Sequence, residues 1–220
     1  MREFPATQFL VFATANGLVK KTNLGAFGNP RAGGIIAIAI EDGDELIGVQ
    51  LTTGASEIML ITRQGMSIRF QEALLLDQGR DTYGVYGISL EKRDRVDSIE
   101  VVEPSATLLA ITENGFGKRT SFEEYRVQNR GGKGIITIKT TERNGLVVGA
   151  HAVHYHDAVM LITSAGQMIR MPVSDIRTIS RNTQGVRLIN LEAGDKLVSA
   201  TPVEPEPVEE VADESPPAPA

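Results

Sequence analysis

The sequence predicts an all-β protein of propeller-like architecture, built from four repeats of about fifty residues with four strands each. Two landmarks recur in register. One has the form apolar-Thr-x-x-Gly, with Ala13 in the apolar place of the first copy and glycines at positions 17, 65, 115 and 166. The other is a glycine that opens a short segment ending in isoleucine, at positions 34, 84, 134 and 185. Units of this kind bury their faces against their neighbours, as propeller blades do.

Each repeat shows the same order of β-type segments. In the second repeat, residues 57–62 and 66–70 are separated by a short turn that contains Gly65, which is typical of a β-hairpin. A loop of some fifteen residues leads to the glycine-started segment, and a last apolar segment closes each repeat (46–52, 96–103, 146–154 and 197–203). No sustained 3.6-residue period indicates a major helix. The repeats are therefore expected near residues 5–52, 53–103, 104–154 and 155–203.

Composition separates the chain into a body and a tail. Residues 1–200 carry 22 basic and 22 acidic side chains, whereas residues 201–220 carry six acids, no base and six of the ten prolines. We expect a β domain over residues 1–203 and a disordered acidic tail over 204–220. Without cysteine there is no disulfide framework and no thiol nucleophile. The longest strictly apolar run, residues 35–40, is too short for a membrane span, so we expect a soluble protein with no membrane partner.

Basic residues recur at one position of the repeat although the body is neutral. Four residues after each turn glycine stand Lys21, Arg69, Arg119 and Arg170, and one residue earlier stand Lys20 and Lys118. A second set lies in the loops: Arg31, Arg80, Arg130 with Lys133, and Arg181. If each unit turns this position the same way, the bases form a belt suited to the evenly spaced phosphates of duplex DNA. The alternative is an ordinary solvated strand face.

The motif Gln128-Asn129-Arg130-Gly131-Gly132-Lys133-Gly134 is the sharpest local signal. Its glycines would let the backbone and its N–H groups approach a phosphate, while Arg130 and Lys133 supply charge. The alternative is a loop that merely turns the chain into the next strand. It is not a P-loop, because Ile135 follows Gly134 and no hydroxyl is placed for magnesium.

Three segments carry a resemblance to a known family. They are Phe12-Ala13-Thr14-Ala15-Asn16-Gly17-Leu18-Val19-Lys20-Lys21-Thr22, Glu113-Asn114-Gly115-Phe116-Gly117-Lys118-Arg119-Thr120, and Glu124-Tyr125-Arg126-Val127 followed by the motif above. With the repeats to about residue 203, the chain resembles the C-terminal domain of bacterial DNA gyrase A. It is similar to the last four of the usual six blades, and its start at Arg2-Glu3-Phe4 looks like the tail of a strand whose own repeat is missing. The blade that holds the family's gyrase box is among the missing ones; Gln128 to Gly134 resembles a relaxed copy of this box, which it matches except at Asn129.

The resemblance implies a β-pinwheel, a propeller-like disc whose blades exchange strands and whose basic rim bends and wraps DNA to support negative supercoiling. It places DNA contact on Gln128, Arg130 and Lys133. It also implies that this chain is not an enzyme and has no catalytic residue, no metal site and no cofactor, because ATP and Mg²⁺ belong to other regions of the holoenzyme. The implied partners are duplex DNA, the rest of the gyrase A protein and the gyrase B protein, in the cytoplasm at the nucleoid.

Two other functions remain open from the sequence. One is the related C-terminal domain of the A protein of topoisomerase IV, and the other is a propeller used as a protein-interaction scaffold, which the neutral body favours. Whether the four blades close into a disc or stay open is also undecided.

Overall fold

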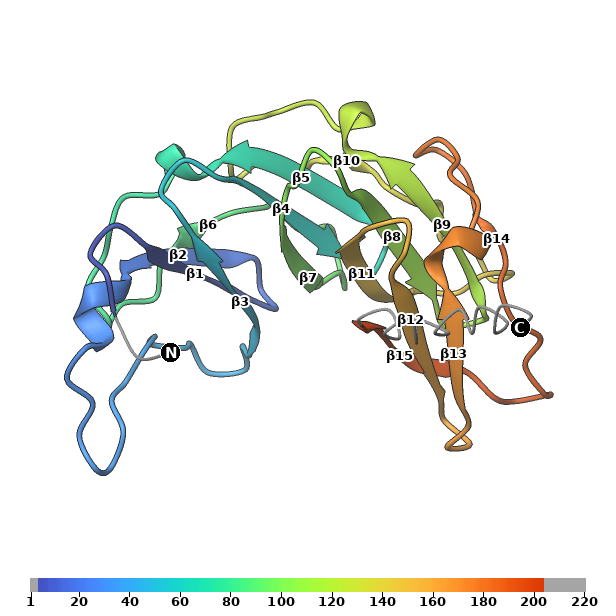
Figure 1. Cartoon of the computed structure of the whole chain (residues 1–220), viewed down its shortest axis with the longest axis horizontal. Helices are drawn as coiled ribbons and strands as arrows, with labels where there is room; N and C mark the ends of the chain where they lie inside the picture. Colours follow the sequence, from blue (N-terminus) through green and yellow to red (C-terminus); the bar gives the residue numbers. More distant parts are fainter. Residues whose placement is uncertain (1–3, 204–220) are drawn as a thin grey trace, which may run out of the picture.

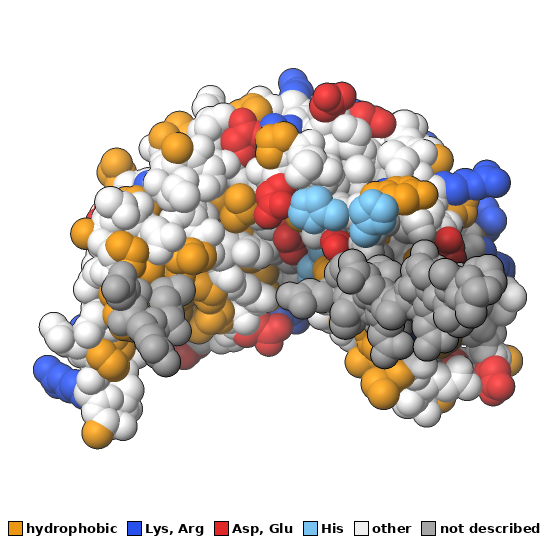
Figure 2. Space-filling view, in the orientation of Figure 1, with side chains coloured by type: hydrophobic (Ala, Val, Ile, Leu, Met, Phe, Trp, Pro, Cys, Tyr) orange, Lys and Arg blue, Asp and Glu red, His pale blue; other side chains and the backbone are white. Residues whose placement is uncertain are grey.

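The computed structural model describes residues 4–203, which fold into four β-sheet blades arranged along an open arch. The first and fourth blades stand at opposite ends of the arch (Figure 1), and the space-filling view shows its hollowed underside (Figure 2). The all-β, propeller-like class is confirmed. The expected tail, residues 204–220, lies outside the described residues, and no helix among those described is long and apolar enough to cross a membrane.

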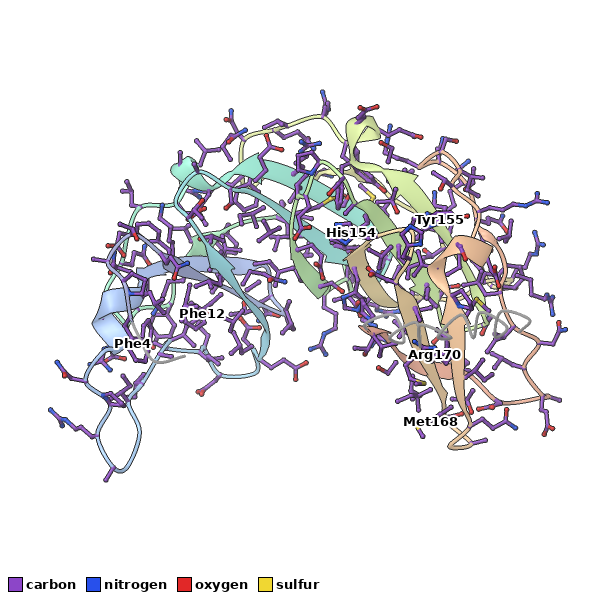
Figure 3. All side chains as sticks on the ribbon, viewed as in Figure 1. Phe4, Phe12, His154, Tyr155, Met168 and Arg170 are labelled. Atoms are coloured by element: carbon purple, nitrogen blue, oxygen red, sulfur yellow. The ribbon has the colours of Figure 1, made fainter. Side chains whose placement is uncertain are left out.

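A two-stranded antiparallel hairpin forms the centre of each blade. The four pairs are β1 (Phe9–Thr14) with β2 (Leu18–Asn23), β4 (Glu57–Thr62) with β5 (Met66–Gln71), β8 (Thr107–Thr112) with β9 (Phe116–Ser121), and β12 (Ala158–Thr163) with β13 (Met168–Pro172). Figure 3 labels Met168 near the free tip of the last hairpin. The repeated Thr-x-x-Gly motif builds the turns: each turn glycine has a positive φ and donates its amide to the carbonyl of the motif threonine.

One further strand lines the inner side of each blade. These strands are β3 (Leu46–Thr52), β7 (Val96–Val101), β11 (Val147–Val153) and β15 (Leu197–Val203), and each pairs with the first strand of its own hairpin. Neighbouring inner strands approach closely because small residues stand between them. A Cβ on Gly149, for example, would lie 2.8 Å from the Ala200 carbonyl oxygen.

His151 joins three blades on this inner side. Its Nδ1 lies 3.0 Å from Glu100 Oε1 and its Nε2 lies 2.9 Å from the Ala200 carbonyl oxygen. Burial alone would lower the pKa of His151, but the hydrogen bond and charge of Glu100 and the Ala200 carbonyl outweigh burial, so the pKa is raised. A histidine between two acceptors satisfies both only when it is doubly protonated.

The outermost strand of a blade comes from the next repeat. The glycine-started segments form two-residue strands, β6 (Val85–Tyr86), β10 (Ile135–Ile136) and β14 (Val186–Arg187), which pair with β2, β5 and β9 of the preceding blade. The sheet orders are therefore β3-β1-β2-β6, β10-β5-β4-β7 and β11-β8-β9-β14. This is the strand exchange of a β-pinwheel.

Strand exchange changes the two end blades. The fourth sheet has three strands, β13-β12-β15, among the described residues, and residues 34–38 of the first repeat belong to no sheet. The expectation of four strands in every repeat thus holds for the first three sheets only, because each fourth strand is supplied by the repeat that follows.

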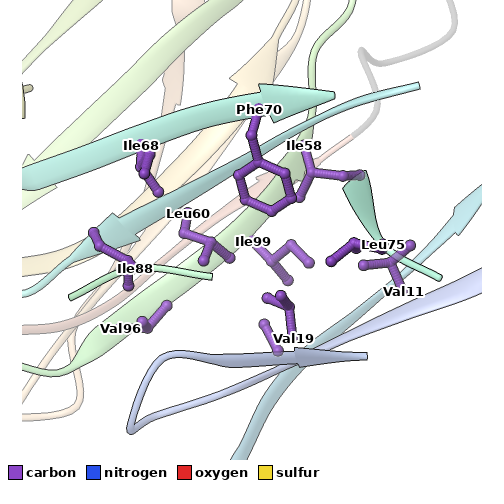
Figure 4. Close-up of a cluster of buried hydrophobic side chains, with 11 residues drawn as sticks. Val11, Val19, Ile58, Leu60, Ile68, Phe70, Leu75, Ile88, Val96 and Ile99 are labelled. Atoms are coloured by element: carbon purple, nitrogen blue, oxygen red, sulfur yellow. The ribbon is translucent and has the colours of Figure 1, made fainter. Parts of the chain in front are cut away.

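Short 3₁₀ turns end the hairpins, and apolar side chains fill the space between blades. The turns are η1 (Leu24–Phe27), η2 (Glu72–Leu74), η3 (Phe122–Glu124) and η4 (Val173–Asp175). Three core clusters lie between successive blades, and Figure 4 shows the first, in which Val11 and Val19 of blade 1 face Leu60 and Phe70 of blade 2. Burial of these faces against one another makes each blade depend on its neighbours.

Candidate nucleic-acid interface

Three loop arginines occupy equivalent places along the outer side of the arch. The Nη1 atoms of Arg80, Arg130 and Arg181 donate to the carbonyls of Ile36, Tyr86 and Ile136 over 3.3, 3.1 and 2.8 Å. Those acceptors are fifty residues apart, so the repeat fixes the spacing of the guanidinium groups. Within residues 4–203 none of the three forms an ion pair, and each side chain is half-buried. Their remaining N–H donors are available to an anion.

Each of these loops runs along the hairpin of the preceding blade. Single parallel bridges join Lys21 to Asp77, Arg69 to Val127 and Arg119 to Thr178, at the start of the three loops. The chain then runs along the outer edge of the hairpin to the glycine-started strand. In the first repeat Arg31, which is exposed, lines one shallow hollow together with Arg80 and residues 34–36, so Arg31 lies on the same side as Arg80.

The Gln128–Gly134 loop lies over blade 2 and contacts β5 and the β6 region. Arg130 donates from Nε to the Leu74 carbonyl over 3.2 Å, and the Gly131 amide donates to the Gly87 carbonyl over 2.7 Å. The Gly131 N–H is therefore not offered to a ligand, contrary to the expectation for this motif. Gly134 has a φ of +75°, and a Cβ there would lie 2.2 Å from the Ser67 carbonyl oxygen. These two glycines serve the packing of the loop.

The polar side chains of this loop differ in their surroundings. Lys133 is exposed and pairs with Glu91, with Nζ 2.8 Å from Oε1. The hydrogen bond and charge of Glu91 raise the pKa of Lys133, so it is cationic at neutral pH. The Nε2 atom of Gln128 is buried and has no hydrogen-bond partner in the described part of the chain.

The expectation of an exposed belt from the strand bases is wrong for most of its members. Lys20, Lys21, Lys118 and Arg119 are each at most 8% exposed. Arg69 is half-buried, and its Nη1 donates to the Phe122 and Tyr125 carbonyls over 2.6 and 3.1 Å. Arg119 Nε donates to the Ile176 carbonyl over 2.8 Å. The positions do recur on one aspect of the repeat, but the loop and 3₁₀ turn of the next repeat cover them.

Arg170 differs because no fifth repeat covers it among the described residues. It stands on β13, in the last blade, and its side chain is exposed (Figure 3). Its counterparts Arg69 and Arg119 show what the recurring base does in this fold: it holds the carbonyl groups of the following 3₁₀ turn. The base that recurs four residues after the turn glycine therefore marks a contact between neighbouring blades.

Lys20 and Lys118 lie directly beneath the loop arginines. Lys20 Nζ donates to the Ala37 carbonyl over 2.7 Å and also to the Arg80 carbonyl. Lys118 Nζ donates to the Ser180 carbonyl over 2.6 Å and also to the Arg181 carbonyl. These lysines position Arg80 and Arg181 from below, a role that composition could not reveal, because their acceptors lie 17 to 63 residues away.

Both lysines have a strongly lowered pKa. Burial lowers the pKa of each to about 8; Asp81 and Glu124 oppose this shift, and the charges of Arg80 and Arg181 add to it. The folded protein therefore releases these protons at a lower pH than the unfolded chain, whose lysines titrate near 10.5.

Replacing one of these lysines tests the shift directly. Between about pH 8 and pH 10.5 the unfolded chain binds more protons than the folded protein, so the free energy of unfolding rises with pH, by up to about 1.4 kcal/mol per pH unit for each lysine. In Lys118→Met we expect half of this rise to disappear, as measured by urea unfolding at pH 7.5, 8.5 and 9.5. The matched control is exposed Lys139→Met, which should keep the wild-type rise. Equal profiles for both variants would contradict the assignment.

Figure 2 shows Lys and Arg side chains at several points of the outer outline of the arch, with Asp and Glu side chains also at its top, while His side chains lie nearer its centre. Guanidinium groups that recur at a fixed repeat suit an extended polyanion better than a small ligand. The exchange of outer strands between successive repeats defines the class of the fold, a propeller-like β-pinwheel.

The chain belongs to the DNA gyrase C-terminal domain, β-propeller family, whose model matches residues 8–53, 56–103, 106–154 and 157–204. These four matches follow the four repeats. The DNA gyrase A protein of Salmonella typhimurium is 44% identical over 215 residues, which are 96% of this chain and 24% of that protein. The chain thus spans about a quarter of the length of that relative.

Solved structures agree with the fold. The C-terminal domain of DNA topoisomerase IV matches with a TM-score of 0.87 at 25% identity, covering 93% of this chain and 64% of that one. The DNA gyrase A C-terminal domain matches with a TM-score of 0.81 at 23% identity, covering 92% of this chain and 68% of that one.

Proposed function

We propose that this chain binds duplex DNA without reading its sequence, and bends and wraps it along the outer rim as the non-catalytic C-terminal domain of a gyrase. Membership of the gyrase family supports DNA binding. The observation that carries the wrapping is the repeat of Arg80, Arg130 and Arg181 on one carbonyl position of successive outer segments. Such an array meets phosphates at intervals along a curved path, and the added contacts offset the cost of bending.

The rim residues take different parts in this proposal. Arg31, Arg80, Arg130, Lys133, Arg170 and Arg181 are proposed to contact phosphates. Gln128, whose Nε2 atom is buried, is proposed to support the loop that carries Arg130 and Lys133. Lys20, Lys21, Arg69, Lys118 and Arg119 act indirectly, because they hold the loops and turns that carry the contact residues.

The chain spans 24% of the length of the Salmonella typhimurium relative, which supports the proposal that the domain works within a larger assembly. We propose that the rest of the gyrase A protein and the gyrase B protein are its partners, that ATP and Mg²⁺ are used by those regions, and that the complex works at the nucleoid in the cytoplasm. The topoisomerase IV alternative rests on the higher TM-score. The 44% identity to a gyrase A protein against 25% to the topoisomerase IV domain favours gyrase.

Two measurements on one sample test the proposal. We expect log K for a duplex of about 150 base pairs to fall steeply and linearly with log salt, by about 0.9 per neutralised phosphate. We also expect ligation of a nicked circle in the presence of the protein to change its linking number in proportion to bound protein. A flat salt dependence would favour the scaffold alternative. A steep salt dependence together with an unchanged linking number would support DNA binding but contradict DNA wrapping.

A further inference from the structure

One arginine of the chain has a backbone conformation that residues with a side chain rarely adopt. Arg93 has a φ of +66°, and among residues 4–203 it is the only residue other than glycine with a positive φ. This left-handed region is unfavourable for an L-residue because its Cβ crowds the following carbonyl oxygen. An observed strain of this kind is a reason to look for a function at the strained residue.

Two other repeats have glycine at this position of the same turn. Residues 91–95 lead into β7, and residues 41–45 and 192–196 lead into β3 and β15 in the same way. Gly43 and Gly194 have φ values of +82° and +87°. In all three turns the amide of an aspartate donates to the carbonyl of the glutamate three residues before it, over 3.0, 3.0 and 3.1 Å. The turn therefore forms equally well with glycine, and the fold does not require Arg93.

The side chain of Arg93 does not relieve the strain by packing. It is exposed, and within residues 4–203 it forms no hydrogen bond, ion pair or ring contact. Nothing lies within 4 Å of the Cβ position of Gly43 or of Gly194, so a side chain at this place in the turn projects into solvent. An arginine here is therefore free to meet a ligand.

Hydrogen bonds fix this turn at the turn end of blade 2, where the hairpin of β4 and β5 reverses. Asp94 Oδ1 accepts from the amides of Gln64 and Arg95 over 2.9 and 2.8 Å. Gln64 Nε2 donates to the Lys92 carbonyl over 3.3 Å. The side chains of Lys92 and Arg93 are thus presented from a fixed backbone.

Two acidic side chains near this turn already have basic partners. Glu91 pairs with Lys133, with Oε1 2.8 Å from Nζ, and Glu45 pairs with Arg95. Lys92 is exposed and has no ion pair in the described part of the chain. The tip of the turn therefore carries two adjacent cations that no acid of this region neutralises.

The turn lies beside the Gln128–Gly134 loop. The Ser89 amide donates to the Gly132 carbonyl over 2.9 Å, and two residues further along Glu91 makes its pair with Lys133. A line of cations thus runs from the rim to the tip of the turn, formed by Arg130, Lys133, Lys92 and Arg93.

We propose that Lys92 and Arg93 bind phosphates of duplex DNA at the turn end of blade 2, as an extension of the rim to one side of the arch. This inference rests on the proposed function, because the rim supplies the other contacts to the duplex. Phosphate oxygens offer the exposed guanidinium group the acceptors that the fold does not. A contact to one side of the rim displaces the duplex toward the turn end at blade 2, which gives the wrapped path a pitch.

Replacing Arg93 with glycine should change stability and DNA binding in opposite directions. Arg93→Gly removes both the backbone strain and the charge, so we expect a higher midpoint of urea unfolding. For a duplex of about 150 base pairs we expect an affinity about fivefold lower and a log–log salt slope shallower by about 0.9. Arg93→Lys keeps the charge and the strain, and should keep the wild-type slope.

Two further variants test the position of the contact. Lys92→Gln combined with Arg93→Gly should make the slope shallower by about 1.8. The matched control is Lys196→Gln, in the same turn of the fourth repeat, where Lys196 Nζ lies 3.0 Å from Glu113 Oε1. Its slope should change by less than half as much as that of Arg93→Gly, and an equal change would overturn the inference.

The outcomes separate this inference from the proposed function. A steep wild-type slope that Arg93→Gly leaves unchanged would overturn the inference and leave DNA binding at the rim in place. A lower urea midpoint together with a lower affinity would show that Arg93 supports the fold, and would also overturn it. A flat slope for the wild type would overturn the proposed function and this inference together.

Discussion

The triple variant Arg80→Gln, Arg130→Gln, Arg181→Gln should lose about 100-fold in affinity for duplex DNA near 0.1 M salt. The log–log salt slope should become shallower by about 2.7, because each lost phosphate contact removes about 0.9. The size of the effect follows from the position of the three guanidinium groups, which are half-buried, without an ion pair within residues 4–203 and equally spaced on the rim. Fluorescence anisotropy of a labelled duplex from 50 to 300 mM salt measures both quantities.

Two controls separate this result from a general loss of charge or fold. Arg63→Gln, Arg95→Gln, Lys196→Gln changes the net charge equally but lies at the turn end of the blades, and we expect its slope to change by less than half as much. The triple lysine variant at residues 80, 130 and 181 retains the charge and should keep the wild-type slope while losing part of the affinity. Equal slopes for the glutamine variant and the wild type would refute a phosphate role for the three arginines.

Two glycine substitutions with the same backbone geometry should differ widely in cost. Gly65 and Gly166 both have a φ of +82°, so alanine meets a similar conformational penalty of about 1–2 kcal/mol at each. At Gly65 the new Cβ would also lie 2.1 Å from the Ile138 carbonyl oxygen and force β10 away from β5. We therefore expect Gly65→Ala to lower the free energy of unfolding by about 3 kcal/mol more than Gly166→Ala.

Urea unfolding of the two variants at one low protein concentration measures this difference in the free energy of unfolding. Gly115→Ala, where the Cβ would lie 2.8 Å from the Ile189 carbonyl oxygen, should fall between the two. Equal costs at all three positions would show that the outer strands contribute little to the stability of the blades.

Much of the fold could be predicted because it depends on local residues. The apolar-Thr-x-x-Gly motif forms the hairpin turn through contacts within five residues, and the period of about fifty residues follows directly from its recurrence. The loop arginines could likewise be aligned by position, and the structure brings three of them to one rim.

The strand bases could not be interpreted from local pattern. Arg69 alternates with apolar Ile68 and Phe70 as a half-exposed strand residue does, but its acceptors are carbonyls of the next repeat, 53 and 56 residues away. A recurring base in every copy is compatible with a surface belt and with a contact between blades. Only the position of the following 3₁₀ turn distinguishes the two.

The sequence by itself determined the four repeats, their hairpins and the spacing of the loop arginines, because turn chemistry and periodicity act over a few residues. Tertiary structure decided which blade each outer strand completes and which bases are buried beneath the loops of the next repeat. The physical reason is that these features depend on backbone carbonyls and apolar faces supplied by neighbouring repeats, which no local pattern records.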